Sequence, residues 1–132
     1  MSRSAKDLIR EFLKVTDAQE FGRYDDLLTG DMIAHFPGGA DMDRQQVEQN
    51  ERTFATAFPD ITRTVEDLIS EGDRVVARAT VRGTHQGEFS GIAPTGRAVE
   101  ATAIAIYRVR DGRIAESWVE ADFLGLLAQL PA

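Results

Sequence analysis

Two histidines are the side chains of this chain best suited to proton transfer near neutral pH, since an unperturbed imidazole both accepts and donates a proton there. His35 ends a short apolar segment, just before the turn-forming pair Pro37-Gly38. We predict His35 as the acid/base of a ligand cavity. The alternative for a single histidine at a strand end is a structural hydrogen bond.

The second histidine lies in the stretch RGTHQGEFSGIAPTGR, residues 82–97, which joins two apolar, β-rich segments. His85 could orient a substrate at the rim or wall of a pocket. It could equally fix the loop by bonding backbone carbonyl groups. Glu88, in the same stretch, is interpreted as a solvated loop charge.

An asparagine interrupts an otherwise apolar helical stripe. Val47, Asn50, Phe54 and Phe58 recur near the spacing that places residues on one helix face. A buried amide costs a few kcal/mol unless it is hydrogen-bonded. Asn50 therefore either lines a pocket or pairs with neighbouring backbone, and Asn50 and Phe54 are both predicted substrate contacts.

Small side chains alternate along one β-rich segment. Ala101, Ala103 and Ala105 share their parity with Tyr107, so all four are predicted on one face of the sheet. Tyr107 could donate a hydrogen bond to a ligand, and the alanines could leave room for a flat molecule. Alternatively, large helix side chains fill that room.

The last β-rich segment offers two further candidates. Trp118 and Glu120 alternate with Val119, so they face the other side of the sheet if Val119 faces inward. A bulge near the strand end could turn Glu120 inward, which keeps it as a second acid/base candidate. Trp118 is kept as a candidate ligand contact, and Asp122 is more simply a helix cap.

Local signals predict the elements that position these side chains. Ser4 can cap a first helix, and Asp43 with Gln46 resembles a capping box. The predicted helices begin at Ser4, run from Glu20 to Leu28 with a stop at Gly30, run from Asp43 to Phe58-Pro59-Asp60, and begin again at Asp122. The predicted strands are Met32 to Phe36, Thr62 to Glu71, Arg74 to Arg82, Ala98 to Arg108 and Arg113 to Ala121, with hairpin turns at Gly72-Asp73 and Asp111-Gly112.

This element order predicts an α+β fold in one domain, residues 1–132: a cone-shaped domain whose strongly curved antiparallel sheet packs on three N-terminal helices, with a short C-terminal helix. The concave face of such a sheet encloses a pocket, and ligand pockets are mostly apolar with a few polar groups. A hydrophobic small molecule is therefore the expected ligand.

Composition excludes several classes of function. The chain has 132 residues, 42% of them hydrophobic, and a net charge of −7, which argues against nucleic acid or an anionic membrane as partner. No apolar run approaches the ~20 residues that span a bilayer, and no signal peptide is evident. Cysteine is absent, so disulfides are excluded and the cytoplasm is the expected location. Because no metal-binding, phosphate-loop or GxSxG motif occurs, we expect no metal and no cofactor.

Longer stretches resemble a known family. AFPDITRTVEDLISEGDRVVARATVRGTHQGEFSGIAPTGRAV, residues 57–99, and IYRVRDGRIAESWVEADFLGLLAQL, residues 106–130, resemble SnoaL-like polyketide cyclases of the nuclear-transport-factor-two-like superfamily. The pattern GTHxGEFxGxxPTGR at Gly83 to Arg97 is fairly specific for that family. The resemblance implies cofactor-free ring closure by intramolecular aldol chemistry, with a cavity carboxylate as acid/base, and a homodimer formed through the sheet.

This sequence departs from the family pattern at the reacting centre. The position of the family's catalytic Asp aligns with Val119, and that of a cavity His aligns with Ala105, whereas Asn50 falls where some members place a substrate-binding Asn. We therefore expect a cyclase or isomerase acting on a hydrophobic polyketide-like carbonyl compound, with His35 as the acid/base. The alternative is a non-catalytic small-molecule-binding or dimerisation domain, and an epoxide hydrolase-like activity ranks last.

Overall fold

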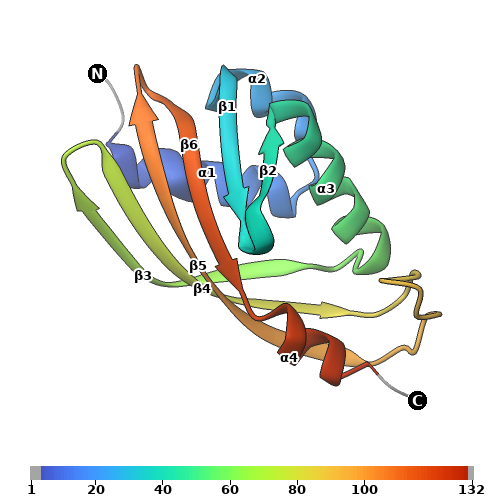
Figure 1. The fold of residues 1–132 in the computed structure, drawn as a ribbon. Helices are drawn as coiled ribbons and strands as arrows, with labels where there is room; N and C mark the ends of the chain where they lie inside the picture. The colour runs from blue at the N-terminus through green and yellow to red at the C-terminus, as the bar shows by residue number, and fades with distance from the viewer. Residues whose placement is uncertain (1–3, 131–132) are drawn as a thin grey trace.

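The fold was obtained as a computed structural model that describes residues 4–130. It consists of one curved sheet whose concave face is covered by helices (Figure 1). The helical elements are α1 (Ala5–Asp17), the 3₁₀ turn η1 (Phe21–Arg23), α2 (Tyr24–Leu27), the 3₁₀ turn η2 (Pro37–Gly39), α3 (Arg44–Ala57) and α4 (Phe123–Ala128). The strands are β1 (Leu28–Phe36), β2 (Ala40–Asp43), β3 (Thr62–Glu71), β4 (Arg74–Thr84), β5 (Ala98–Arg110) and β6 (Arg113–Ala121).

The strand order within residues 4–130 is β2-β1-β6-β5-β4-β3. All neighbouring strands pair antiparallel except β1 and β6, which run parallel. The α+β class and the curved sheet are as predicted, and the parallel pair is a feature that the sequence did not indicate. Long antiparallel strands β3, β4 and β5 form the curved wall, and β1 with β2 closes the other edge (Figure 1).

Helix caps explain where α1 and α3 begin. The Ser4 hydroxyl accepts a hydrogen bond from the Asp7 backbone N–H at 3.1 Å. Asp43 and Gln46 form the predicted capping box: Asp43 accepts from the Gln46 N–H at 2.8 Å, and Gln46 accepts from the Asp43 N–H at 2.9 Å. Each such bond satisfies a backbone donor that a helix start otherwise leaves free.

The predicted second helix is wrong beyond Leu27. The chain leaves the helix at Leu28 and continues as strand β1, so Gly30 lies within a strand and does not end a helix. Leu27 and Leu28 are both fully buried, and two adjacent buried leucines fit a helix or a strand end equally well. Pairing of Leu28 with Ile114 of β6 selects the strand. Strand β2 was also not predicted; η2 connects it to β1, with Gly38 at a φ of +83°.

The hydrophobic core has two parts. The larger part packs α1, α2 and β1 against the middle of the sheet, and the smaller part gathers around Phe58, Leu126 and Leu130 beneath α4. The outer face of the sheet is not covered by any described element, and it exposes Ile33, Ile69 and Ile104. Nowhere between residues 4 and 130 does a helix have the length and apolar character required to cross a bilayer.

Candidate active site

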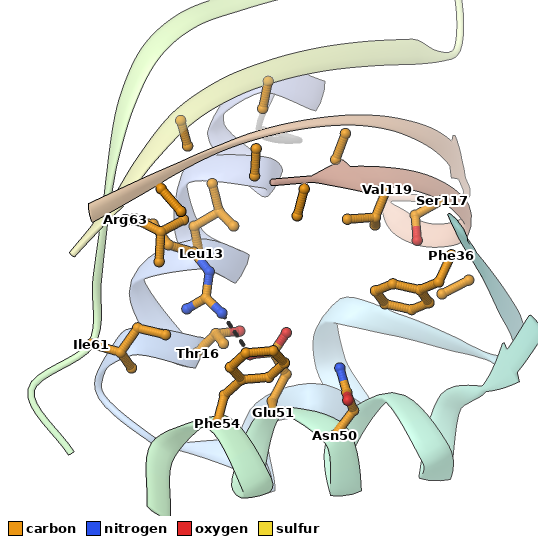
Figure 2. A pocket seen from close by; sticks show the side chains of 18 of the residues that line it. Leu13, Thr16, Phe36, Asn50, Glu51, Phe54, Ile61, Arg63, Ser117 and Val119 are labelled. Atoms are coloured by element: carbon orange, nitrogen blue, oxygen red, sulfur yellow. Dashed lines mark hydrogen bonds and ion pairs between the residues drawn. The ribbon is translucent and has the colours of Figure 1, made fainter. Parts of the chain in front are cut away.

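A cavity of about 150 Å³ lies between the concave face of the sheet and helices α1, α3 and α4 (Figure 2). Its sheet side is lined mainly by small side chains: Ala77, Ala79, Ala101, Ala103, Ala105 and Ala121. Its helix side carries larger apolar groups, among them Phe12, Leu13 and Phe54. Because helix side chains do not fill the space above the alanines, the cavity stays open to a ligand.

The alternation of the strands decides which side chains reach the cavity. Tyr107 and the alternate alanines of β5 line it, as do Ser117 and Val119 of β6. Ala105 and Val119 are register partners on neighbouring strands, and both face the cavity. The predicted parity of these two strands is thus confirmed. Ala105 and Val119, where the family resemblance expects a histidine and an aspartate, place apolar groups in the cavity wall.

Tyr107 places a phenol in the cavity wall. The residue is 6% exposed, and its ring packs edge-on against Phe12 at a centroid distance of 6.0 Å. No described residue forms a hydrogen bond with its hydroxyl. Burial raises the pKa of Tyr107 to about 12. The Arg63 charge lowers this pKa and the Glu51 charge raises it, both by smaller amounts. The hydroxyl is therefore protonated at physiological pH and can donate a hydrogen bond to a ligand oxygen.

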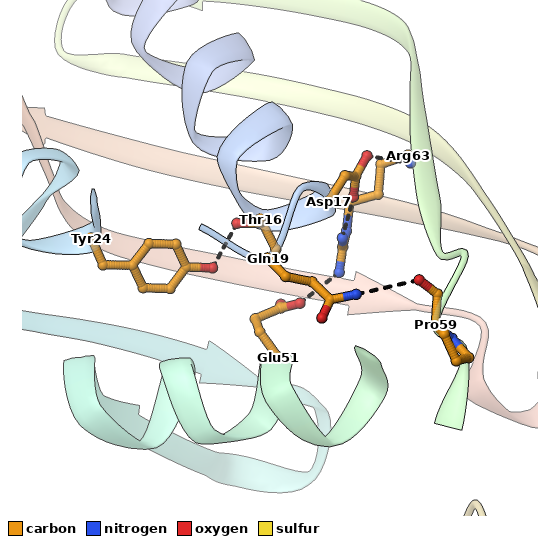
Figure 3. A network of polar contacts seen from close by, with 7 residues as sticks. All are labelled: Thr16, Asp17, Gln19, Tyr24, Glu51, Pro59 and Arg63. Carbon is orange, nitrogen blue, oxygen red and sulfur yellow. Dashed lines mark hydrogen bonds and ion pairs between the residues drawn. The ribbon is translucent and has the colours of Figure 1, made fainter. Parts of the chain in front are cut away.

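Three charged side chains form a cluster at one end of the cavity (Figures 2 and 3). The Arg63 guanidinium donates through Nη2 to Glu51 Oε2 at 2.7 Å and through Nη1 to Asp17 Oδ1 at 2.6 Å. The Arg63 backbone N–H donates to the other oxygen of Asp17 at 2.8 Å. Arg63 and Glu51 line the cavity, with side chains only 14% and 18% exposed. Burial lowers the pKa of Arg63, but the Glu51 and Asp17 carboxylates outweigh it, so the guanidinium stays charged.

Uncharged hydrogen bonds extend this cluster along α1. The hydroxyls of Thr16 and Tyr24 are 2.6 Å apart and both are buried, and burial raises the pKa of Tyr24 above its usual value. Gln19 Nε2 donates to the Pro59 carbonyl oxygen at 3.3 Å (Figure 3). The polar network therefore ties α1 to α3 and to the segment that leads into β3.

Arg63, Glu51 and Asp17 were not among the predicted site residues. One signal for Arg63 was available, because it shares the inward parity of Val65 in β3. An arginine at an inward-facing strand position needs carboxylate partners. Those partners come from α1 and α3, and the sequence does not show that these helices meet there.

Besides Tyr107, two predicted substrate contacts line the cavity. Asn50 and Phe54 project from α3 toward the sheet (Figure 2). Phe54 also packs on Phe89 and Phe123, at centroid distances of 5.4 and 5.9 Å. The structure thus brings Asn50, Phe54 and Tyr107 to one cavity together with Glu51 and Arg63. Their roles toward a substrate remain predictions.

His35 lies elsewhere, and its assignment as the cavity acid/base is wrong. Met32, Ala34 and Phe36 of β1 line the cavity, so the alternation turns His35 to the outer face. There its Nδ1 is 2.8 Å from Asp41 Oδ1, and its Nε2 is 2.7 Å from Glu116 Oε2. The Glu116 carboxylate, followed by that of Asp41, raises the pKa of His35.

Trp118 and Glu120 also face outward. The Trp118 ring stacks on His35 at a centroid distance of 5.4 Å, and the Arg74 guanidinium lies 4.8 Å from its ring centre. Glu120 is exposed and does not line the cavity, since no bulge turns it inward. Their placement as cavity residues is therefore wrong, whereas the parity predicted for them is confirmed.

His85 stabilises the loop that connects β4 to β5. It is fully buried, and its Nδ1 accepts a hydrogen bond from the Thr95 backbone N–H at 3.2 Å. Its own backbone N–H donates to the Arg97 carbonyl at 2.9 Å, and its carbonyl accepts from the Gly96 N–H at 2.9 Å. The ring packs on Phe58, behind the cavity wall, and His85 does not line the cavity. The structure favours the loop-fixing interpretation of His85, but the ring contacts the backbone N–H and the hydroxyl of Thr95, and the bond to a carbonyl comes from the His85 backbone N–H.

Known proteins share this architecture. The sequence profile of SnoaL-like polyketide cyclases matches residues 6–130. The structure is similar to that of IdmH, a proposed polyketide cyclase from Streptomyces antibioticus, with a TM-score of 0.90, 35% identity, and coverage of 97% of this chain and 99% of IdmH. No curated protein sequence gives a significant match.

Two further solved structures are similar over most of the chain. AclR, a proposed hydroxylase from Streptomyces galilaeus, has a TM-score of 0.87 and 28% identity, covering 95% of this chain and 83% of AclR. TsrD from Streptomyces laurentii has a TM-score of 0.83 and 31% identity, covering 96% of this chain and 93% of TsrD.

Proposed function

Because this chain belongs to the SnoaL-like polyketide cyclase family, we propose that it catalyses a cofactor-independent cyclisation or isomerisation of a hydrophobic, polyketide-like carbonyl compound. The observation that carries the proposal is the Tyr107 hydroxyl, which no described residue binds, in the wall of an otherwise largely apolar cavity. Because Tyr107 lines the cavity and its hydroxyl has no partner among residues 4–130, a ligand carbonyl oxygen can accept its hydrogen bond.

The apolar walls hold a ketone with its oxygen toward Tyr107, and the Asn50 amide orients a second polar group. Removal of a proton from the carbon next to the carbonyl gives an enolate, whose oxygen accepts a hydrogen bond from the Tyr107 hydroxyl. The enolate carbon then bonds to a second carbonyl carbon of the same molecule, and the resulting alkoxide takes up a proton. An isomerisation instead returns the proton to a different carbon.

A screen with product analysis tests the proposal. We expect aromatic polyketide ketones to raise the melting temperature, and at least one to be converted to a product of equal mass and changed chromatographic retention, because an intramolecular aldol reaction conserves mass. Tyr107→Phe should lower that turnover at least ~10-fold while leaving the fold intact, because it removes one donor to the developing enolate oxygen. Equal turnover by the Phe variant would contradict the role of Tyr107.

One observation favours a second candidate function, a non-catalytic binding or dimerisation domain. Ala105 and Val119 place methyl groups where the resemblance expects a histidine and an aspartate. In the same screen, a ligand that raises the melting temperature and is recovered unchanged would favour binding. Sedimentation equilibrium would measure dimerisation, for which the outer face offers the exposed Ile104, at 47% exposure.

A further inference from the structure

We infer that Glu51 is the group that removes and returns the proton in this cavity, a role that rests on the proposed proton-transfer function. Of the side chains described between residues 4 and 130, Glu51 and Asp122 are the two carboxylates that line the cavity. Asp122 caps α4, since its Oδ1 accepts a hydrogen bond from the Gly125 backbone N–H at 2.8 Å. Glu51 is thus the carboxylate that remains for chemistry.

The two oxygens of Glu51 have different surroundings. Oε2 accepts a hydrogen bond from Arg63 Nη2 at 2.7 Å. Oε1 accepts none from residues 4–130, so its lone pairs are available to a substrate proton. The bond to Arg63 fixes the orientation of the carboxylate, and a general base must be held at hydrogen-bonding distance from the proton it removes.

The charges of the cluster support the same assignment. Asp17 binds Arg63 through both the side chain and the backbone N–H, and this pair alone is neutral. The Glu51 carboxylate is therefore the surplus negative charge in a buried setting. A proton that Glu51 receives from a substrate therefore brings the cluster to zero net charge and leaves the Arg63–Asp17 pair in place.

The proposed proton transfer involves only the substrate and the Glu51 side chain. Glu51 Oε1 takes the proton from the carbon next to the carbonyl, and the electron pair of the broken C–H bond moves into the enolate. The enolate oxygen accepts a hydrogen bond from the Tyr107 hydroxyl. After the new bond has formed, the protonated Glu51 returns its proton to the alkoxide or to carbon, and the carboxylate is restored.

Hydrogen–deuterium exchange at C1 of 2-tetralone tests this inference without knowledge of the natural substrate. This bicyclic ketone carries an acidic C–H next to its carbonyl, and proton NMR in D₂O follows the loss of that signal. We expect the wild-type protein to accelerate the exchange and Glu51→Gln to lower the accelerated rate at least ~100-fold, as for loss of a positioned base. Glu51→Gln keeps an oxygen that accepts from Arg63, and an unchanged circular dichroism spectrum would verify its fold.

The matched control is Glu48→Gln on the same helix. Glu48 pairs with Arg52 outside the cavity, at 3.0 Å, so this variant should exchange 2-tetralone at the wild-type rate. Exchange by Glu51→Gln within twofold of wild type would overturn the inference. Binding of 2-tetralone by the wild-type protein without accelerated exchange, with binding measured by saturation-transfer NMR, would overturn it as well. Failure to convert any polyketide, with the expected exchange pattern intact, would contradict the proposed natural reaction and leave the role of Glu51 standing.

Discussion

Replacing Arg63 with methionine should lower the free energy of unfolding by about 3–5 kcal/mol. The variant leaves the Asp17 and Glu51 carboxylates without their shared cation, although both are largely buried. Removing one partner of a buried ion pair is far more costly than removing the whole pair. Urea denaturation would measure the change as a shift of the unfolding midpoint.

Two control variants make this result specific. Arg78→Met breaks an ion pair with Asp67 on the exposed outer face and should cost at most about 1 kcal/mol. The triple variant Arg63→Met, Asp17→Asn, Glu51→Gln removes every charge of the cluster and should recover much of the lost stability. If Arg63→Met were no less stable than Arg78→Met, the buried cluster would not exist as described.

Replacing Gly87 with alanine should lower the free energy of unfolding by about 2–3 kcal/mol, the upper part of the range for an overpacked site. An added Cβ would overlap the Thr56 carbonyl oxygen and lie 3.0 Å from its carbonyl carbon. The loop cannot easily move away, because the N–H groups of Gln86 and Gly87 both donate to the Ala57 carbonyl at 3.0 Å. Thermal or urea unfolding would measure this loss.

Gly22→Ala is the matched control for that variant. No atom lies within 4 Å of the position of its added Cβ, and its φ is not positive. We expect its stability to stay within about 0.5 kcal/mol of wild type, as for exposed substitutions without a special constraint. Equal effects of the two alanines would mean that the loop does not pack on the end of α3.

Much of the fold follows from local patterns. Ser4, Asp43 and Gln46 mark helix starts through their own hydrogen-bonding groups. The alternation of alanines and Tyr107 along β5 was sufficient to predict which side chains face the cavity. These features depend on neighbours within a few residues, so they can be recognised in a single sequence. The parallel pairing of β1 with β6 depends on segments about 80 residues apart, and no local pattern encodes it.

The site was predicted less well, for a physical reason that His35 and Arg63 illustrate. His35 was selected for its chemistry, although the apolar Met32, Ala34 and Phe36 on the alternate positions of β1 already implied that it faces outward. The inward parity of Arg63 is a weak signal by itself, because a charged residue is usually exposed. Its burial is possible only because α1 and α3 bring Asp17 and Glu51 to it, which is a tertiary arrangement.

The central claim is that the cavity between the sheet and the helices receives an apolar carbonyl ligand. Titration of alanine-methyl-labelled protein with 2-tetralone, followed by carbon–proton NMR, tests it most directly. The cavity alanines Ala101, Ala103 and Ala105 should shift in a saturable manner, whereas the exposed Ala40 should not. Cavity methyl signals that stay unchanged at saturating ligand, or that shift no more than Ala40, would contradict the claim.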